Sequence, residues 1–227
     1  MSSAPRRFGI YDCALSRRAT GRVATNLRDL LESLRRVPPE VIEHHMMRCA
    51  LEDYFELYEF PNDLAQWAWD SLGDHILGEQ LGLVDPYQHA SIEALREFLI
   101  NLIEDHLWDK DRIPWSRPGR ELHFIQSKLI AFDTGEEVAT PAELTEAIER
   151  MSLRSLYFHV HEAHRRTSGQ TDDFSLWLEG IHADPFLIGR IRSIDFYFLN
   201  LSQLRQELLH AFRQHAAEQY AVGKGFE

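Results

Sequence analysis

Two histidines, His45 and His159, occupy the apolar stripe of an expected helix in each half of this 227-residue chain. An imidazole can move protons near neutral pH, and a carboxylate beside it fixes which ring nitrogen carries the proton. Asp63 and Asp173 are the candidate partners. The alternative is a core histidine whose ring nitrogens are merely hydrogen-bonded. Each histidine is therefore either structural or the floor of a ligand pocket.

A tryptophan follows each aspartate at the i,i+4 spacing of one helical face, Trp67 after Asp63 and Trp177 after Asp173. In one interpretation the acid stabilises the first helical turn and the tryptophan fills the core. In the other, the indole lines a pocket and the aspartate accepts a hydrogen bond from a ligand hydroxyl.

Two arginines, Arg96 and Arg205, stand at matching positions of the last long helix in each half. We expect each to join that helix to a carboxylate, with Asp85 and Asp195 as candidates, or to clamp an anion. The pocket candidates are thus His45, Asp63, Trp67, Arg96, His159, Asp173, Trp177 and Arg205.

Metal-binding residue types gather near both histidines. His45 and Cys49 have i,i+4 spacing, and His161 and His164 have i,i+3 spacing. These ligands suit zinc or copper, but a site needs three or four of them in one geometry. The two groups do not correspond position by position. We expect no metal site, with these four residues as candidates if one exists, and we assign no cofactor.

Composition and charge exclude several classes of protein. A net charge of −12 argues against a nucleic-acid partner, which needs a basic surface. No apolar run approaches the ~20 residues that span a bilayer, and the first residues lack a signal peptide, so we expect a cytoplasmic protein without a membrane partner. Nucleotide-binding and nucleophile-elbow motifs are absent, which disfavours an enzyme.

The two halves of the chain repeat one pattern. The segment NDLAQW at 62–67 corresponds to DDFSLW at 172–177, and residues 91–99 correspond to residues 200–208. His45 and His159 also correspond. This order, broken only by loop-sized gaps, predicts a tandem duplication with a period of about 110 residues. We expect a first copy at 1–108, a linker at 109–120, a second copy at 121–217 and a tail at 218–227.

Each copy is expected to contain a short strand or hairpin followed by helices. The fold class is α+β and predominantly helical, with two copies related by a pseudo-twofold axis. Aromatic and β-branched residues place the strands at 8–15 and 122–132. N-capping residues and helical periodicity place helices at 26–36, 39–58, 62–67, 74–84 and from 91 in the first copy, and at 140–150, 153–167, 172–177, 184–194 and from 200 in the second.

Charge is unevenly distributed along the chain. Residues 1–36 hold eight arginines against three acids, whereas residues 37–110 hold three basic residues against sixteen acids. Such complementary segments favour pairing within the chain or between subunits, so a homo-oligomer is an expected assembly.

Several residues of the second half form a recognisable pattern: His159, Glu162, the Asp172-Asp173-Phe174 step with Trp177, and the capped Leu-rich helix after a Thr-Gly pair. In these features the sequence resembles a bacterial and archaeal domain-of-unknown-function family, number five-seven-five-two (DUF5752). The resemblance extends over nearly the whole chain. The first copy departs from it with Leu64 where the second has Phe174. The resemblance implies a fold and no activity.

We therefore expect a non-enzymatic tandem-repeat protein that binds a small molecule or a protein, itself included, in a regulatory or assembly role. The alternative is an enzyme or metal protein that uses the His, Asp and Trp positions of one or both copies.

Overall fold

The computed structural model describes residues 7–52, 59–108, 112–167 and 169–224, with side chains to residue 220. Helices make up most of this part of the chain, and two strands form one sheet. The protein is thus α+β and predominantly helical, as the sequence predicts. No helix among the described residues is long and apolar enough to cross a membrane.

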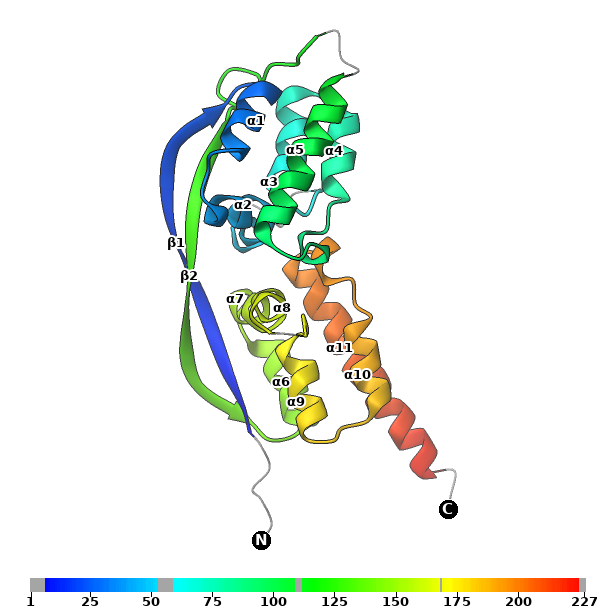
Figure 1. Ribbon diagram of the computed structural model, residues 1–227. Coiled ribbons are helices and arrows are strands. Elements are labelled where there is room, and N and C mark those ends of the chain that lie inside the picture. Colours follow the sequence, from blue (N-terminus) through cyan, green and yellow to red (C-terminus); the bar gives the residue numbers. More distant parts are fainter. Residues whose placement is uncertain (1–6, 53–58, 109–111, 168, 225–227) are drawn as a thin grey trace. The chain divides into compact units, whose positions relative to one another are not determined.

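The described residues form two compact units (Figure 1). Unit 2 lies within residues 15–129, and unit 1 combines residues from 1–14 with residues from 130–227. These units differ from the expected copies, because the start of the chain groups with the second set of helices. The copy boundaries at 108, 121 and 217 remain a prediction about the sequence.

The sheet consists of β1 (Phe8–Ala24) and β2 (Leu122–Val138), which pair with one another in antiparallel fashion. Both strands are longer than predicted. The strand of each half pairs with the strand of the other half, so of the two predicted alternatives, a short strand or a hairpin, the hairpin is wrong. Gly21 and Gly135 lie beyond the predicted ends of the strands but inside the observed strands, with positive φ values of +78° and +76°. Glycine tolerates this backbone because it has no Cβ.

In each strand, the threonine next to the glycine forms a hydrogen bond with the opposite strand. The Thr20 hydroxyl donates a hydrogen bond to the Phe124 carbonyl at 2.8 Å, and the Thr134 hydroxyl donates one to the Ile10 carbonyl at 2.6 Å. The first contact lies in unit 2 and the second in unit 1. Each unit therefore contains a paired length of both strands.

Unit 2 packs its helices around a leucine-rich core. Side chains cap the helices where the sequence predicts: Asn26 before α1, Asn62 before α3 and Asp74 before α4. Such caps satisfy backbone N–H groups that have no partner within the helix. The helices are α1 (Leu27–Leu34), α2 (Pro39–Met46), α3 (Asp63–Trp67), α4 (His75–Gly82) and α5 (Ile92–Trp108); a 3-10 turn (Arg48–Leu51) follows α2, and a π-helical turn (Ala68–Leu72) continues α3.

Unit 1 is built in a similar order. Thr140 caps α6 with Pro141 at the first helical position, and Asp172 caps α9. The long α11 packs against α6 and α10. The helices are α6 (Pro141–Arg150), α7 (Leu153–Tyr157), α8 (Ala163–Arg166), α9 (Asp173–Gly180), α10 (Pro185–Arg192) and α11 (Leu201–Lys224); a π-helical turn (Phe158–Glu162) joins α7 to α8.

The second expected helix of the first half is shorter than predicted. Helix α2 ends at Met46, because Met47 leaves the helical region with φ −133° and ψ −51°. A 3-10 turn follows to Leu51, and Glu52 is extended. Residues 53–58, the end of the predicted helix, lie outside the described residues.

The described part of the expected linker is anchored to unit 2. The Ser116 N–H donates to the Thr25 carbonyl at 2.7 Å, and the Arg117 N–H donates to the Ser71 carbonyl at 3.2 Å. These bonds hold residues 116–121 against the end of α3 as the chain enters β2. This segment thereby becomes one wall of a pocket.

Candidate functional site

His45 is buried in unit 2 and uses both ring nitrogens. Its Nδ1 lies 3.0 Å from Asp63 Oδ2, and its Nε2 accepts a hydrogen bond from the Ile125 N–H at 3.1 Å. Because a backbone N–H can only donate, Nε2 must be unprotonated, and Nδ1 must carry the proton that Asp63 accepts. Strand β2 and the first turn of α3 thus fix one tautomer of this imidazole.

His159 has the same arrangement in unit 1. Its Nδ1 lies 2.7 Å from Asp173 Oδ2, and its Nε2 accepts a hydrogen bond from the Tyr11 N–H at 3.0 Å. Tyr11 precedes Ile125 by the same number of residues as His159 follows His45. The two units therefore repeat an aspartate–histidine–backbone arrangement, in which the strand comes from the other half of the chain.

This hydrogen bonding limits the chemistry of both histidines. A general base needs a free ring nitrogen, but the Nε2 lone pair already accepts a backbone N–H. A proton added to Nε2 would place two donors face to face. Both rings are almost fully buried, at 3% exposure for His45 and 1% for His159. Their geometry suits a structural role, in which each histidine joins a strand to a helix through hydrogen bonds.

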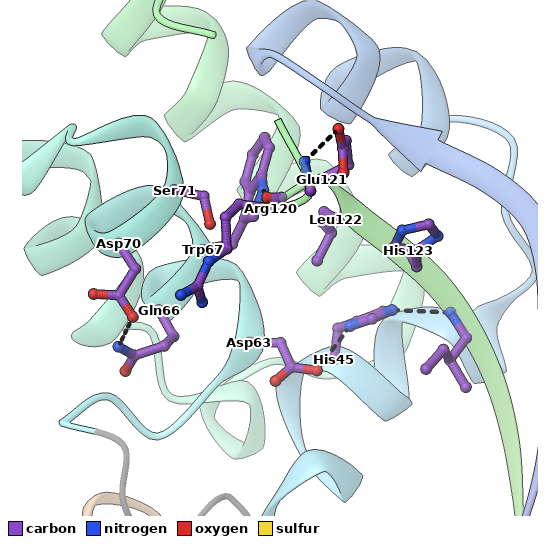
Figure 2. Close-up of a pocket in the computed structure, with 12 residues that line it drawn as sticks. His45, Asp63, Gln66, Trp67, Asp70, Ser71, Arg120, Glu121, Leu122 and His123 are labelled. Carbon is purple, nitrogen blue, oxygen red and sulfur yellow. Dashed lines mark hydrogen bonds and ion pairs between the residues drawn. The ribbon is translucent and has the colours of Figure 1, made fainter. Parts of the chain in front are cut away.

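A pocket of about 290 Å³ opens beside His45 in unit 2 (Figure 2). One wall is the exposed side of α3 and its π-helical turn, and the other is the chain entering β2. Trp67 joins the walls, since its indole N–H donates to the Arg120 carbonyl at 3.0 Å. The lining residues are His45, Asp63, Gln66, Trp67, Asp70, Ser71, Gly119, Arg120, Glu121, Leu122, His123 and Ile125.

Two polar groups of this pocket have no partner among the described residues. Gln66 donates through its amide nitrogen to Asp70 at 2.7 Å, which leaves its Oε1 buried without a hydrogen bond. The Arg120 guanidinium makes no hydrogen bond or ion pair with a described residue, and its backbone alone is engaged. A buried acceptor without a donor costs free energy unless a ligand or water satisfies it.

The charges of the lining are mixed. Asp63, Asp70 and Glu121 supply carboxylates, and Arg120 supplies a guanidinium. Hydrogen bonds from the backbone N–H groups of Glu121 itself and of Gly119 lower the pKa of the Glu121 carboxyl. Glu121 is thus held as an anion at the rim.

In unit 1, side chains of the protein itself pack against His159, which corresponds to His45, and against Asp173; residues 5 and 6, which correspond to Gly119 and Arg120, lie outside the described residues. The Phe8 ring packs against His159, Phe174 and Trp177, with centroid distances of 4.9, 5.6 and 5.7 Å. Arg166 forms an ion pair with Asp173. Phe8 stands three residues before Tyr11, as Leu122 stands three before Ile125, so the smaller Leu122 faces the pocket where unit 1 has an aromatic ring.

A possible metal cluster adjoins the pocket. Ligand atoms of His44, His45 and Asp63 lie within 4.8 Å of one another, and both ring nitrogens of the fully buried His44 lack a partner among the residues that the structure describes. A metal at His45 Nδ1 would move the proton to Nε2, against the Ile125 N–H. This donor set therefore fits a cation poorly. Burial lowers the pKa of His44 to about 3, so its ring is neutral.

The other metal candidates do not join this cluster. The Cys49 thiol lies 3.4 Å from the His45 carbonyl, and burial raises its pKa well above the usual range. His161 stacks on Tyr157 at 4.8 Å, and burial lowers its pKa to about 3. His164 Nδ1 lies 2.7 Å from the Val160 carbonyl. Each of these side chains packs within its own unit.

Arg96 and Arg205 each join two helices through hydrogen bonds and do not line the pocket. Arg96 bonds to the Leu34 carbonyl at the end of α1 and pairs with Glu93 at 2.7 Å. Arg205 donates to the Met151 carbonyl at the end of α6 at 2.5 Å. The predicted partners Asp85 and Asp195 are wrong. A cation bound to the last carbonyls of a helix is favoured by the helix dipole.

Several pocket residues are not among those predicted from the sequence. Gln66 and Asp70 share the helical face of Asp63 and Trp67 at i,i+3 and i,i+7 spacing, a signal that could have identified them. Arg120 lies at the end of the expected linker and His123 near the start of a strand. No local pattern connects these two positions with α3.

The chain matches a family model described as a family of unknown function (DUF5752) over residues 5–213. The chain belongs to the DUF5752 family. This DUF5752 protein is also similar to the solved structure of OrfY from Thermoproteus tenax, with a TM-score of 0.73 and 26% identity. The match covers 94% of this chain and 97% of OrfY. No curated protein matches the chain.

Proposed function

We propose that the protein binds a small molecule in the pocket of unit 2 and does so without catalysing a reaction. The observation that carries this proposal is the cavity of about 290 Å³ whose lining holds a buried acceptor, Gln66 Oε1, and an exposed cation, Arg120, neither of which has a side-chain partner in the described part of the chain. A cavity of this size with a few convergent polar groups is the usual form of a ligand site.

Binding is favoured over catalysis by the state of His45. This imidazole lines the pocket, but both its nitrogens are engaged with Asp63 and Ile125. Removal of a proton from a ligand would require the Ile125 hydrogen bond to break first. A binding site has no such requirement, because His45 then serves only to hold Asp63 in place.

We further propose that the two halves of the chain are copies that diverged. Matched contacts support this: Thr20 and Thr134 on the opposite strand, and His45 and His159 on backbone N–H groups of that strand. In this proposal unit 2 keeps an open pocket, and Phe8 and Arg166 fill the equivalent space in unit 1.

A thermal-shift screen of the full chain tests the binding proposal. Metals, nucleotides, polyols, amino acids and organic acids are added singly, since specific binding raises Tm by mass action. We expect Leu122→Phe, which places an aromatic ring where unit 1 has one, to abolish the shift that wild type gives. Phe8→Leu in unit 1 is the matched control and should keep it. Equal shifts in wild type and Leu122→Phe would overturn the proposal.

A further inference from the structure

The pocket of unit 2 has charged groups on both walls, and their placement bears on the kind of ligand it takes: the α3 wall carries only acids, and the other wall carries Arg120 with Glu121 at its rim. The wall formed by α3 supplies the carboxylate of Asp63 and the unsatisfied acceptor Gln66 Oε1. The wall formed by residues 119–125 supplies the Arg120 guanidinium. In Figure 2 the Arg120 side chain extends from that wall toward the face of α3 that carries Gln66.

The α3 wall needs a hydrogen-bond donor. Asp63 accepts from His45 through Oδ2, and its side chain remains 13% exposed. Gln66 Oε1 cannot be satisfied by Asp70, because Asp70 already receives the Gln66 amide N–H and offers only acceptors when ionised. An ammonium group offers three donors and a positive charge, which match the acceptors of this wall, the Asp63 carboxylate first and the Gln66 amide oxygen second.

The opposite wall offers an exposed cation, Arg120, that can bind an acceptor. The Arg120 guanidinium has five N–H donors and no partner among the described residues. A carboxylate is the planar acceptor that binds a guanidinium with two parallel hydrogen bonds. Glu121, the nearest acid in sequence, is engaged by Gly119 and does not pair with Arg120.

We propose that the ligand is a small zwitterion of the amino-acid class. Its ammonium group binds Asp63 and Gln66, and its carboxylate binds Arg120. This inference rests on the proposed function, because it names the chemistry of the same pocket. The cavity volume of about 290 Å³ is sufficient for a single amino acid.

Isothermal titration of the full chain with the free L-amino acids tests the proposal. The best binder is then compared with its N-acetyl derivative, which lacks the ammonium group, and its amide, which lacks the carboxylate. Each derivative is expected to bind about 10- to 100-fold more weakly, since each loses charge-assisted hydrogen bonds. Binding of both derivatives as tightly as the free amino acid would overturn the inference.

Two pocket variants test which side chain binds each end of the ligand. Arg120→Met should weaken the free amino acid about tenfold or more and leave the affinity for its amide unchanged. Gln66→Leu should weaken the free amino acid and leave the N-acetyl derivative unchanged. Both side chains lie outside the core, and circular dichroism verifies that the variants fold. Equal losses for all three compounds would contradict the assignment.

The outcomes separate this inference from the proposed function. If no amino acid binds but a polyol, nucleotide or organic acid binds in a manner that Leu122→Phe abolishes, the zwitterion is wrong and the binding function stands. If no compound binds, both fail. If an amino acid binds equally to wild type and Leu122→Phe, it binds elsewhere, and both proposals are again wrong.

Discussion

At the scale of single residues, the pair His45–Asp63 shows how a buried imidazole can be structural in a position that suggests chemistry. The ring joins a helix, a carboxylate and a backbone N–H of strand β2. An exposed histidine would make these bonds in competition with water. In the core no water replaces a lost partner, so each bond matters more for stability.

His45→Ala is expected to reduce the free energy of unfolding by about 2–5 kcal/mol. The substitution leaves the Asp63 carboxylate and the Ile125 N–H without their partner, at about 1–3 kcal/mol each. Urea unfolding followed by circular dichroism measures the loss. His123→Ala, an exposed histidine of the same pocket, is the control and should change stability by less than about 0.5 kcal/mol. A similarly small loss for His45→Ala would contradict the structural role.

Both cysteines are expected to resist alkylation in the native protein. Burial and the charge of Asp12 raise the pKa of the Cys13 thiol to about 12, and burial raises the pKa of Cys49. The reactive thiolate is therefore scarce at pH 8. Mass spectrometry after iodoacetamide treatment should find no adduct in native buffer and two adducts in urea. Rapid native labelling of either residue would show that the thiol is accessible.

At the scale of elements, helices α3 and α9 are capped by side chains of the same shape, Asn62 and Asp172. Asn62 has an amide nitrogen where Asp172 has a second carboxylate oxygen, so only Asn62 can also donate a hydrogen bond. Asn62 accepts from the Ala65 N–H at 2.9 Å through Oδ1 and donates through Nδ2 to the Leu81 carbonyl at 3.0 Å. Asp172 accepts from the Ser175 N–H at 2.7 Å. The Asn62 amide therefore joins two helices, because Leu81 belongs to α4.

Asn62→Asp is expected to destabilise the protein by about 2–4 kcal/mol. The cap acceptor is kept, but an oxygen then faces the Leu81 carbonyl in a fully buried site. The reciprocal variant Asp172→Asn keeps the oxygen that accepts the cap hydrogen bond and removes a buried carboxylate. Burial already raises the pKa of that carboxyl, so the stability of this variant should change little. Thermal unfolding at pH 7 compares the two. Equal losses would mean that capping alone matters.

At the scale of the whole molecule, each unit contains a buried histidine whose pKa is lowered by burial, His44 in unit 2 and His161 in unit 1. Burial lowers the pKa of each to about 3 from an ordinary value of 6.5. Above pH 6.5 both folded and unfolded states are neutral at these rings. Between pH 6.5 and about 3 only the unfolded state binds the proton, so stability falls as pH falls.

We expect each histidine to lower the free energy of unfolding by up to about 1.4 kcal/mol for every unit by which the pH falls within that range. Replacing His44 by Leu should flatten the dependence of the unfolding free energy on pH below 6.5, and His161→Phe should do the same. Urea unfolding at pH 7.0, 6.0 and 5.0 measures the slopes. Unchanged slopes in both variants would show that other groups cause the acid sensitivity.

Much of the fold is readable from local sequence. Asn26, Thr140 and Asp172 cap helices because their short polar side chains reach nearby N–H groups, which requires no distant contact. The apolar spacing likewise predicts α5 and α11 and their buried leucines. Family membership also follows from the sequence.

Only the tertiary structure decided how the halves are joined and where a ligand could bind. Pairing of β1 with β2 and the bonds from Ile125 and Tyr11 to the histidines connect residues 80 and 148 positions apart. Helical periodicity reports which face of one element is apolar and says nothing of its partner. The sequence by itself determined most of the helices and their caps, and it offered an aspartate as the candidate partner of each histidine. The tertiary structure decided that both imidazoles are already hydrogen-bonded and that Arg120 faces α3, because those contacts form only when distant segments pack together.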